Sequence, residues 1–349
     1  MAFIKNLWYV AAWATEMKQN EPLARVIIGE PIVIWRDSQG SLVGMDNRCP
    51  HRLAPLSKGR FDGDTVQCMY HGMRFSKTGE CLSVQGSDQP PASCAVKTYP
   101  VVEKDDWIWI WMGDSNLADE SLIPDAWGLN NDKYVMIEDA IDYEAHYELI
   151  NDNLCDLSHL DFVHETTLGA ATGQIWSEDS YDISLIDNGL YLQRWLTRPL
   201  DPNQENQADT WNTYRYLLPG LFLMTVCIYP PGTAEKLNYA PPPEDFDVKP
   251  LMIRVEQQAV TPISETETRY LFATGTTPEF CGGIEDLRER MDVVIAAFTE
   301  DREMIEAQQK MWNLTDENHK KVFIPYDKAP NMMRRLISRR LKEEAAEVS

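Results

Sequence analysis

The chain of 349 residues has no run of about 18 apolar residues, so the sequence predicts no membrane-spanning helix. Positive charge is scarce: 32 Lys and Arg oppose 55 Asp and Glu, for a formal net charge of −23. Binding to nucleic-acid phosphates requires the opposite balance. The first residues lack the charged start, apolar core and cleavage site of a signal peptide. We therefore expect a cytoplasmic protein with neither a membrane nor a nucleic-acid partner.

Cysteine and histidine are also few, with seven and six residues. An odd number of cysteines in a cytoplasmic chain argues against a disulfide framework and favours metal binding. Four of the six histidines fall into two clusters, within residues 49–71 and 151–165. These two clusters carry most of the functional signal in the sequence.

The chain changes character along its length. Residues 1–113 hold short strand-like runs broken by Gly, Pro and Asp, and residues 114–125 form a polar connection. Long alternating runs in residues 178–275 predict a larger antiparallel sheet. Residues 283–312 and 330–344 predict two late helices. This order predicts an α+β protein with a small β-domain followed by an α+β domain.

The first cluster reads Cys-Pro-His at residues 49–51 and Cys-Met-Tyr-His at residues 68–71, with sixteen residues between them. Zinc fingers usually pair Cys with Cys and His with His, whereas each half here carries one of each. Mixed halves are typical of a Rieske [2Fe-2S] cluster, in which two Cys hold one iron and two His hold the other. The predicted ligands are Cys49, His51, Cys68 and His71. A structural zinc site is the alternative.

The second cluster is NDNLCDLSHLDFVHE at residues 151–165, in which His159 and His164 lie five positions apart. Five residues of a regular helix turn by about 500°, so the helix must end or distort if both rings bind one metal. Two His and one carboxylate bind non-haem Fe(II) and leave coordination positions open. A capped surface helix with an incidental His pair is the alternative.

A late helix offers the carboxylate. Its apolar stripe runs through Ile284, Leu287, Met291, Val294 and Phe298. The next helical step is Asp301, and because an unpaired buried carboxylate is costly, we predict that Asp301 is the third ligand. Asp161 and Glu165 are nearer in sequence to the two His but are less well placed to reach a shared metal. Glu300 and Arg302 should then face solvent; the alternative is a frayed helix with Asp301 in solvent.

Together these motifs resemble the oxygenase component of the Rieske non-haem iron oxygenases, in the group of vanillate and dicamba O-demethylases and toluenesulfonate methyl-monooxygenase. The resemblance extends over nearly the whole chain and rests on the runs NLWYVAAW, YPVVEKDDWIWIWMGD, LINDNLCDLSHLDFVH and FTEDREMIEA. It implies a Rieske domain at residues 1–115 and a helix-grip (START-like) catalytic domain at residues 116–349. It also implies a homotrimer, in which Asp156 links the cluster of one subunit to an iron-ligand His of the next. Asn153 matches a position close to the iron that is not a ligand.

The resemblance further implies an enzyme, a terminal monooxygenase that uses O2 to hydroxylate a methyl carbon of a small aromatic substrate. A vanillate-like methoxy acid would lose formaldehyde; attack on an aryl methyl group, or N-demethylation, is the alternative. The chain lacks a Gly-rich dinucleotide-binding motif, so a reductase, with or without a ferredoxin, must deliver electrons from NAD(P)H. A Rieske electron carrier would not need the second His pair, and a zinc-stabilised module would need no iron. We expect the substrate under the long sheet, near residues 215–275, with Gln257 and Gln258 as polar anchors.

Overall fold

A computed structural model of the protein describes residues 3–18, 21–87, 89–91, 93–129, 131–165, 167–168, 176, 181–197, 208–316 and 319–347. The chain forms two compact units, of which unit 1 comprises Met1–Gly128 and Thr261–Glu265 and unit 2 comprises Leu129–Val260 and Thr266–Ser349. The predicted domain boundary at residue 115 stays a prediction. Within the described residues, no helix has both the length and the apolar character needed to cross a membrane.

The described part of unit 1 holds three small antiparallel sheets. The first contains β1 (Trp8–Trp13), β11 (Trp107–Trp111) and β10 (Val101–Lys104), in that order. The second contains β2 (Leu23–Ile27), β3 (Glu30–Arg36), β4 (Leu42–Asp46) and β9 (Thr98–Tyr99). The third contains β5 (Arg60–Phe61), β6 (Thr65–Gln67), β7 (Arg74–Ser76) and β8 (Cys81–Ser83). Short turns of helix, η1 (Ala14–Glu16) and η2 (Leu56–Lys58), lie between strands of different sheets, and η3 (Ser115–Leu117) and η4 (Glu120–Leu122) follow β11.

Strand β11 forms the centre of the first sheet. Its alternation of Trp and Ile predicts one face of indoles, and Trp107 and Trp111 do stack on Trp13 and Trp8, with ring centroids 5.2 Å and 5.6 Å apart. The intervening isoleucines are equally buried, so all five residues of the strand lie in the core. Both faces of β11 are therefore packed.

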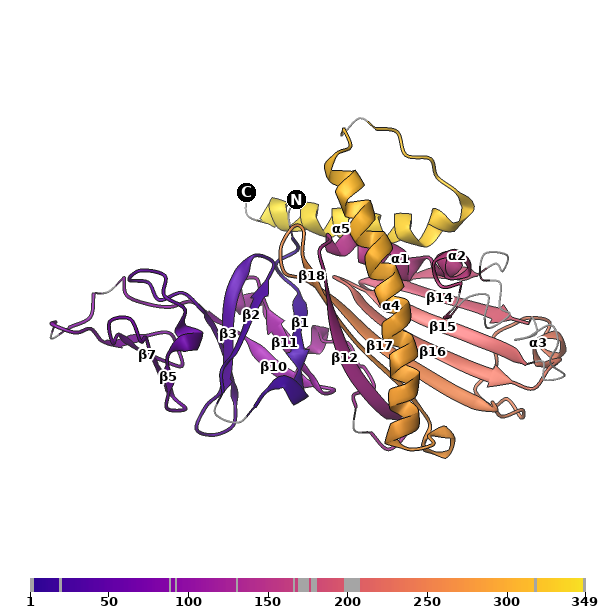
Figure 1. Ribbon diagram of the computed structural model, residues 1–349, viewed down its shortest axis with the longest axis horizontal. Helices are drawn as coiled ribbons and strands as arrows, with labels where there is room; N and C mark the ends of the chain where they lie inside the picture. Colours follow the sequence, from indigo (N-terminus) through magenta and orange to yellow (C-terminus); the bar gives the residue numbers. More distant parts are fainter. Residues whose placement is uncertain are drawn as a thin grey trace. The chain divides into compact units, whose positions relative to one another are not determined.

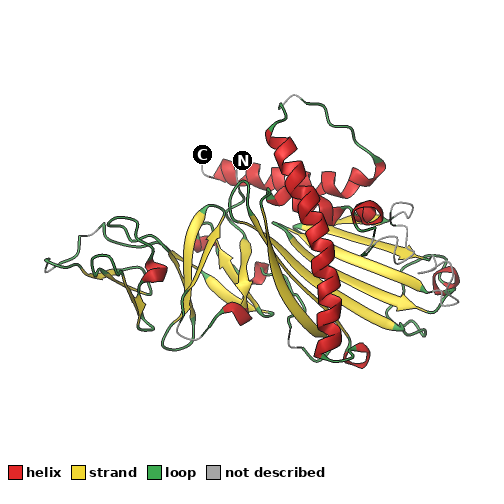
Figure 2. Cartoon of the chain, viewed as in Figure 1, coloured by secondary structure: helices red, strands yellow, loops and turns green. Residues whose placement is uncertain are grey.

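Unit 2 is built on a seven-stranded antiparallel sheet (Figure 1, Figure 2). Its order is β12 (Val135–Tyr143), β18 (Thr268–Thr276), β17 (Met252–Pro262), β16 (Leu221–Tyr229), β15 (Asp209–Leu217), β14 (Gly189–Leu196) and β13 (Asp182–Ile186). The predicted sheet in residues 178–275 is confirmed, and β12 joins it from earlier in the chain. Strands β13 to β17 each pair antiparallel with the next strand in the chain, so alternate residues along each strand present one continuous surface.

Helix α4 (Ile284–Asn313) lies across this sheet, and α5 (Lys328–Glu347) follows it (Figure 1). Phe298 of α4 packs on Tyr270 and Phe272 of β18, with centroids 5.1 Å and 4.8 Å apart. Both predicted late helices are confirmed. Among the residues that the structure describes, the remaining helical segments are α1 (Tyr147–Cys155), η5 (Leu157–His159), α2 (Leu160–Val163), α3 (Thr233–Lys236), η7 (Pro278–Phe280) and η8 (Pro325–Asp327).

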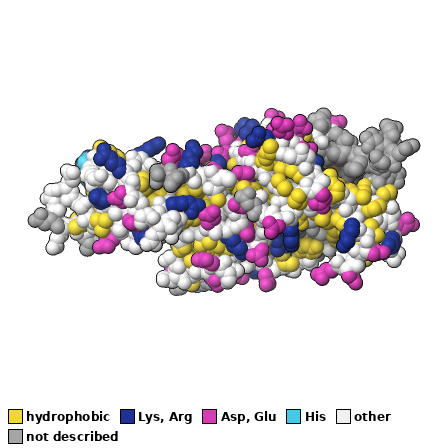
Figure 3. Space-filling model, turned by 90° about the horizontal axis from the view of Figure 1, so that it is seen from below, with side chains coloured by type: hydrophobic (Ala, Val, Ile, Leu, Met, Phe, Trp, Pro, Cys, Tyr) yellow, Lys and Arg dark blue, Asp and Glu magenta, His cyan; other side chains and the backbone are white. Residues whose placement is uncertain are grey.

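The charged side chains are dispersed. Acidic and basic groups are interspersed over the face shown in Figure 3, so on that face the excess of carboxylates does not gather in one patch. Many acidic groups are also engaged in surface ion pairs, for example Asp142 with Arg269 at 3.2 Å. Such exposed pairs contribute little stability individually.

Candidate metal centres

Two loops of unit 1 that carry the first Cys–His cluster share one backbone geometry. In each loop the N–H of the Cys donates to the carbonyl five residues later, at 2.9 Å for Cys49 and 2.8 Å for Cys68. The residue four positions after the Cys donates back to its carbonyl, at 2.9 Å in both loops. That residue is Leu53 in one loop and Gly72 in the other, with φ of 57° and 72°. The left-handed residue closes each loop, so the two halves of the motif are structural counterparts.

The four predicted cluster ligands divide by exposure. Cys49 and Cys68 are each 2% exposed, whereas His51 and His71 lie at the surface with ring centroids 4.6 Å apart. Burial raises the pKa of the Cys49 thiol to about 11, so a bound cation is required to hold it as thiolate. Two buried thiols beside two exposed imidazoles suit a [2Fe-2S] cluster with an inner Cys-bound iron and an outer His-bound iron.

The second cluster is shaped by two departures from regular helix. Helix α1 ends at Cys155, and Asp156 is extended, with φ −124° and ψ 96°. The chain then makes the single turn η5, continues as α2 and leaves the helix at His164, with φ −105° and ψ 37°. The predicted helix end between the two His is confirmed. It brings the rings of His159 and His164 to a centroid distance of 5.3 Å.

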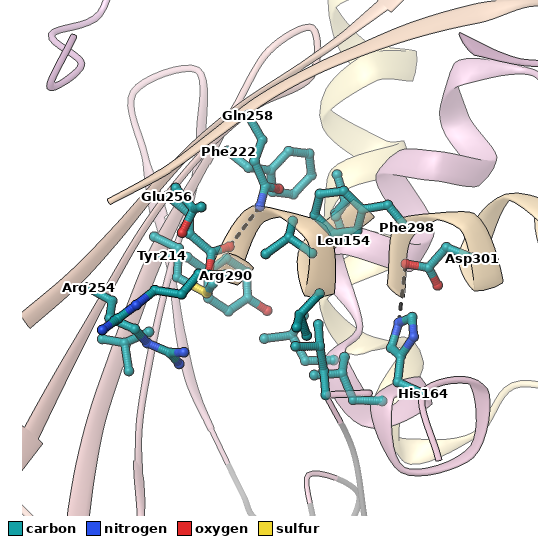
Figure 4. Close-up of a pocket in the computed structure, with 18 of the residues that line it drawn as sticks. Leu154, His164, Tyr214, Phe222, Arg254, Glu256, Gln258, Arg290, Phe298 and Asp301 are labelled. Atoms are coloured by element: carbon teal, nitrogen blue, oxygen red, sulfur yellow. Dashed lines mark hydrogen bonds and ion pairs between the residues drawn. The ribbon is translucent and has the colours of Figure 1, made fainter. Parts of the chain in front are cut away.

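Asp301 of α4 meets these two rings inside unit 2. Its Oδ2 lies 3.2 Å from His164 Nε2, and its Oδ1 lies 3.5 Å from His159 Nε2 (Figure 4). One ligand atom from each of the three residues lies within 4.8 Å of the others. Three donors bound at right angles about 2.1 Å from one ion would be about 3 Å apart. The donor set and its spacing therefore fit a mononuclear Fe(II) site, and Asp301 is 3% exposed, as its place in the helix stripe predicts.

The far nitrogen of each imidazole is also held. His164 Nδ1 lies 2.8 Å from Glu300 Oε2, which also accepts a 2.7 Å hydrogen bond from Thr167 Oγ1. His159 Nδ1 contacts the main-chain carbonyl of Asp156. Both Nε2 atoms are thereby turned towards Asp301. Metal-binding His usually need such a partner, which fixes the tautomer and the ring orientation.

The third donor is oriented as well. Asn153 Nδ2 donates a 2.8 Å hydrogen bond to Asp301 Oδ1 from helix α1. The two alternative carboxylates lie elsewhere: Asp161 accepts from the Trp176 amide at 2.9 Å, and Glu165 is exposed. Among the described residues, the triad of two His and one carboxylate is thus completed by Asp301 alone.

One expectation about a neighbouring residue is wrong. Glu300 does not face solvent but is half-buried, with its carboxylate 2.8 Å from His164 Nδ1. His159 Nδ1 contacts the main-chain carbonyl of Asp156, and the link that the Asp156 carboxylate is expected to make between subunits stays a prediction. Oδ1 of Asp156 accepts from the Ser158 amide at 2.9 Å and caps η5. A helical pattern alone gave no signal for the role of Glu300, since it lies one residue from the inward stripe.

The charges around the triad favour a cation. Burial lowers the pKa of His159, and the carboxylate of Asp301 offsets only part of that effect. Burial also acts to lower the pKa of His164, but Asp301 and Glu300 together raise it above its ordinary value. Two carboxylates therefore lie against two imidazoles in a low-dielectric setting, where the electrostatic attraction between a divalent cation and the carboxylates is strongest.

A cavity of about 440 Å³ extends from the triad along the inner face of the sheet (Figure 4). Alternate residues of two strands line it, namely Phe222, Met224, Val226 and Ile228 of β16 and Arg254, Glu256 and Gln258 of β17. Gln258 lines this cavity but Gln257 does not, because consecutive residues of a β-strand point to opposite faces of the sheet. The predicted place under the sheet is confirmed, and the size suits a small aromatic molecule.

Both halves of the chain match known families. Residues 7–100 match the Rieske [2Fe-2S] domain, and residues 143–343 match the vanillate O-demethylase oxygenase C-terminal domain. The chain belongs to the Rieske non-haem iron oxygenases, as an oxygenase component. Its cofactors are therefore a Rieske [2Fe-2S] cluster and a mononuclear non-haem iron, for which the two sites above supply the fitting donors.

The relatives of this Rieske oxygenase cover its full architecture. It is 36% identical to the toluene-4-sulfonate monooxygenase system iron-sulfur subunit TsaM1 of Comamonas testosteroni, over 98% of both chains. It is 30% identical to the dicamba O-demethylase oxygenase component of Stenotrophomonas maltophilia, over 89% of both chains. The crystal structure of dicamba monooxygenase bound to dicamba superimposes with a TM-score of 0.82 at 27% identity, covering 99% of this chain and 100% of that one.

Proposed function

We propose that this oxygenase hydroxylates a methyl carbon of a small aromatic acid, and that its main reaction is O-demethylation of a vanillate-like methoxy acid with release of formaldehyde. The observation that carries this proposal is the triad of His159, His164 and Asp301 at one end of a cavity with largely apolar walls. When bound there, Fe(II) supplies O2 activation, with electrons drawn from the cluster.

The side chains of the chain itself have distinct parts in this proposal. His159, His164 and Asp301 hold the iron, and Asn153 keeps the Asp301 carboxylate in place through its 2.8 Å hydrogen bond. Phe298 and other apolar lining residues exclude water and hold the aromatic ring against the sheet. Cys49, His51, Cys68 and His71 hold the cluster.

Hydroxylation of an aryl methyl group is the second candidate. It is favoured by one observation, the 36% identity over 98% of the chain with a toluene-4-sulfonate monooxygenase subunit, against 29% with a vanillate O-demethylase subunit. Both reactions place a methyl carbon at the same iron. They differ in the atom that carries the methyl group, and formaldehyde release distinguishes them.

The partners follow from the cofactors. Oxygenase components of this kind work in multicomponent systems, so we propose a reductase, with or without a ferredoxin, that brings electrons from NAD(P)H. We also propose a homotrimer in which the cluster of one subunit serves the iron of the next through Asp156. Exposed apolar side chains support such contacts: Leu53 and Tyr70 beside the cluster ligands are 68% and 60% exposed, and Phe162 between the two iron-site His is 76% exposed.

A substrate screen with metal analysis tests the proposal. The purified protein should contain about three iron atoms and about two acid-labile sulfides per chain. With a reductase and NADH it should release formaldehyde from a methoxybenzoate, with matching O2 uptake. An aryl sulfonate that is hydroxylated without formaldehyde would favour the second candidate. A protein with two irons and no O2 uptake with any aromatic acid would contradict both.

A further inference from the structure

The cavity has one polar end, and it lies away from the iron triad. Arg254 and Arg290 lie on one side of the close-up, and His164 and Asp301 lie on the other (Figure 4). Arg254 comes from strand β17 and Arg290 from the first half of helix α4. The wall between the two ends is formed largely by apolar side chains, including Leu154, Phe222 and Phe298. A molecule that fills the cavity therefore meets an iron at one end and two guanidinium groups at the other.

The two arginines differ in how they are held. Arg290 is braced on its own helix, since its Nε lies 3.0 Å from Asp286 Oδ2 and it also donates to the Phe280 carbonyl at 3.4 Å. The Arg254 side chain is exposed where it lines the cavity; its guanidinium makes no hydrogen bond or ion pair with the described residues, and its charge acts on the nearby Glu256 carboxyl. Its donors remain available, and a planar guanidinium binds carboxylate or sulfonate oxygens through paired N–H groups. Arg254 is thus the principal anchor, and Arg290 is a pre-oriented second donor.

Glu256 lines the same end of the cavity as these arginines. Its carboxylate accepts a 3.0 Å hydrogen bond from Gln258 Nε2, as the close-up shows (Figure 4). Burial raises the pKa of Glu256, against the lowering effect of Arg254. Asp286 balances the charge of Arg290 through their 3.0 Å ion pair, so the positive charge that remains for a ligand at this end comes from Arg254. In a protein of net charge −23, a local positive field of this kind is what an anionic ligand needs to enter.

We infer that Arg254 and Arg290 bind an anionic substituent of the aromatic substrate, a sulfonate or a carboxylate, so that its methyl-bearing end points to His159, His164 and Asp301. The inference rests on the proposed function for the identity of the reacting end. Arg254 and Arg290 would thus determine specificity and set the orientation of the substrate. The anionic group of that substrate would lie on the ring position away from the methyl group. The anion reduces the number of binding poses and brings one methyl carbon to the iron.

Binding and turnover of three matched compounds test this inference with the iron- and cluster-loaded protein. The probes are 4-methylbenzenesulfonate, 4-methylbenzoate and the neutral 4-methylbenzamide, each measured by calorimetry and by substrate-dependent O2 uptake. The native protein should bind one of the two anions at least about tenfold more tightly than the amide. The preferred anion identifies the natural substituent.

The variants are Arg254→Gln, Arg254→Lys and, as a matched control on the exposed face of α4, Arg288→Gln. Arg254→Gln should raise the Kd and KM of the preferred anion about tenfold and leave those of the amide unchanged, because only a charge-assisted hydrogen bond is lost. Arg254→Lys should restore part of the affinity, and Arg288→Gln should leave both Kd and KM unchanged.

Equal affinity for anion and amide in the native protein would overturn the inference, as would an unchanged Kd in Arg254→Gln. Failure of the proposed function would appear differently, as anion binding without O2 uptake with these methyl arenes and with their 4-methoxy analogues.

Discussion

The two metal centres of this oxygenase contrast in how the chain builds them. The proposed cluster ligands come from two loops close in sequence, which share one hydrogen-bonded geometry, and the two histidines among them are at the surface. The proposed iron ligands come from η5, from the end of α2 and from α4, far apart in sequence, and Asp301 and His164 are 3% and 1% exposed. Each iron ligand is also held by another group, such as Glu300 or Asn153.

This difference matches what each centre has to do. A cluster that exchanges electrons with other proteins needs an exposed edge, and the two surface imidazoles provide one. An iron that reacts with O2 and a methyl group needs a dry enclosure and ligands that do not move. The two supports are separate in the chain, so the two centres should respond independently to substitution.

The largest expected effect is that of Asp301→Ala. It removes the carboxylate from the triad, so the mononuclear iron should be lost and turnover should fall to background, while the visible absorption of the cluster remains. Iron and sulfide analysis with absorption spectra measures both sites in one sample. Glu303→Ala, an exposed position on the same helix, is the control. Full iron content in Asp301→Ala would show that this residue is not a ligand.

The second effect concerns the link between the centres. Asp156→Asn should leave both metal contents intact, because Asn also caps helices well and the contact to His159 comes from the main-chain carbonyl. If the carboxylate connects a neighbouring cluster to the iron, oxidation of the reduced cluster in a single turnover should slow by about a hundredfold. Stopped-flow absorption measures that rate. A normal rate would remove the proposed bridge.

That the candidate ligands of each centre come together could be predicted from sequence because their geometry is local. A Cys-x-His and Cys-x-x-His pair needs only two tight loops, and the three-and-four spacing of apolar residues before Asp301 follows directly from the helix period. The helix end near His164 was predictable for the same reason, since five residues on a regular helix would separate the two rings.

The supporting groups were not predictable, because they depend on how distant elements pack. Glu300 lies about 100° around the helix from Asp301, and only the direction in which His164 leaves α2 turns it into a partner. Gln257 and Gln258 are both buried, so alternation alone does not tell which of them faces the cavity. The pairing of Arg254 with Arg290 requires the placement of β17 against α4, for which no local pattern exists.

A smaller effect should follow from Glu300→Gln. The amide keeps the size of the side chain but weakens the bond to His164 Nδ1, so iron affinity should fall about tenfold while the cluster is unaffected. Iron-binding titrations of the cluster-loaded protein measure the change, with Glu303→Gln as the matched control. Thermal unfolding without iron should be nearly unchanged. A loss of thermal stability with unchanged iron affinity would assign Glu300 a purely structural part.

The smallest effect separates the two cluster loops, which share their backbone hydrogen bonds but differ in the residue at their left-handed position. Leu53 has φ of 57° and is 68% exposed, so it bears backbone strain that Gly72 does not, with little burial in return. Leu53→Gly should therefore stabilise unit 1 by about 1 kcal/mol, and Gly72→Ala should destabilise it by a similar amount. A Cβ at Gly72 would meet the end of the flexible Gln85 side chain at 3.2 Å, so backbone strain dominates there too.

Leu53→Ala is the control, since it removes the side chain but keeps the strained φ. If Leu53→Ala leaves stability unchanged yet slows reduction by the reductase, the exposed side chain is retained for contact with a partner. If Leu53→Gly destabilises the unit, the strain argument fails.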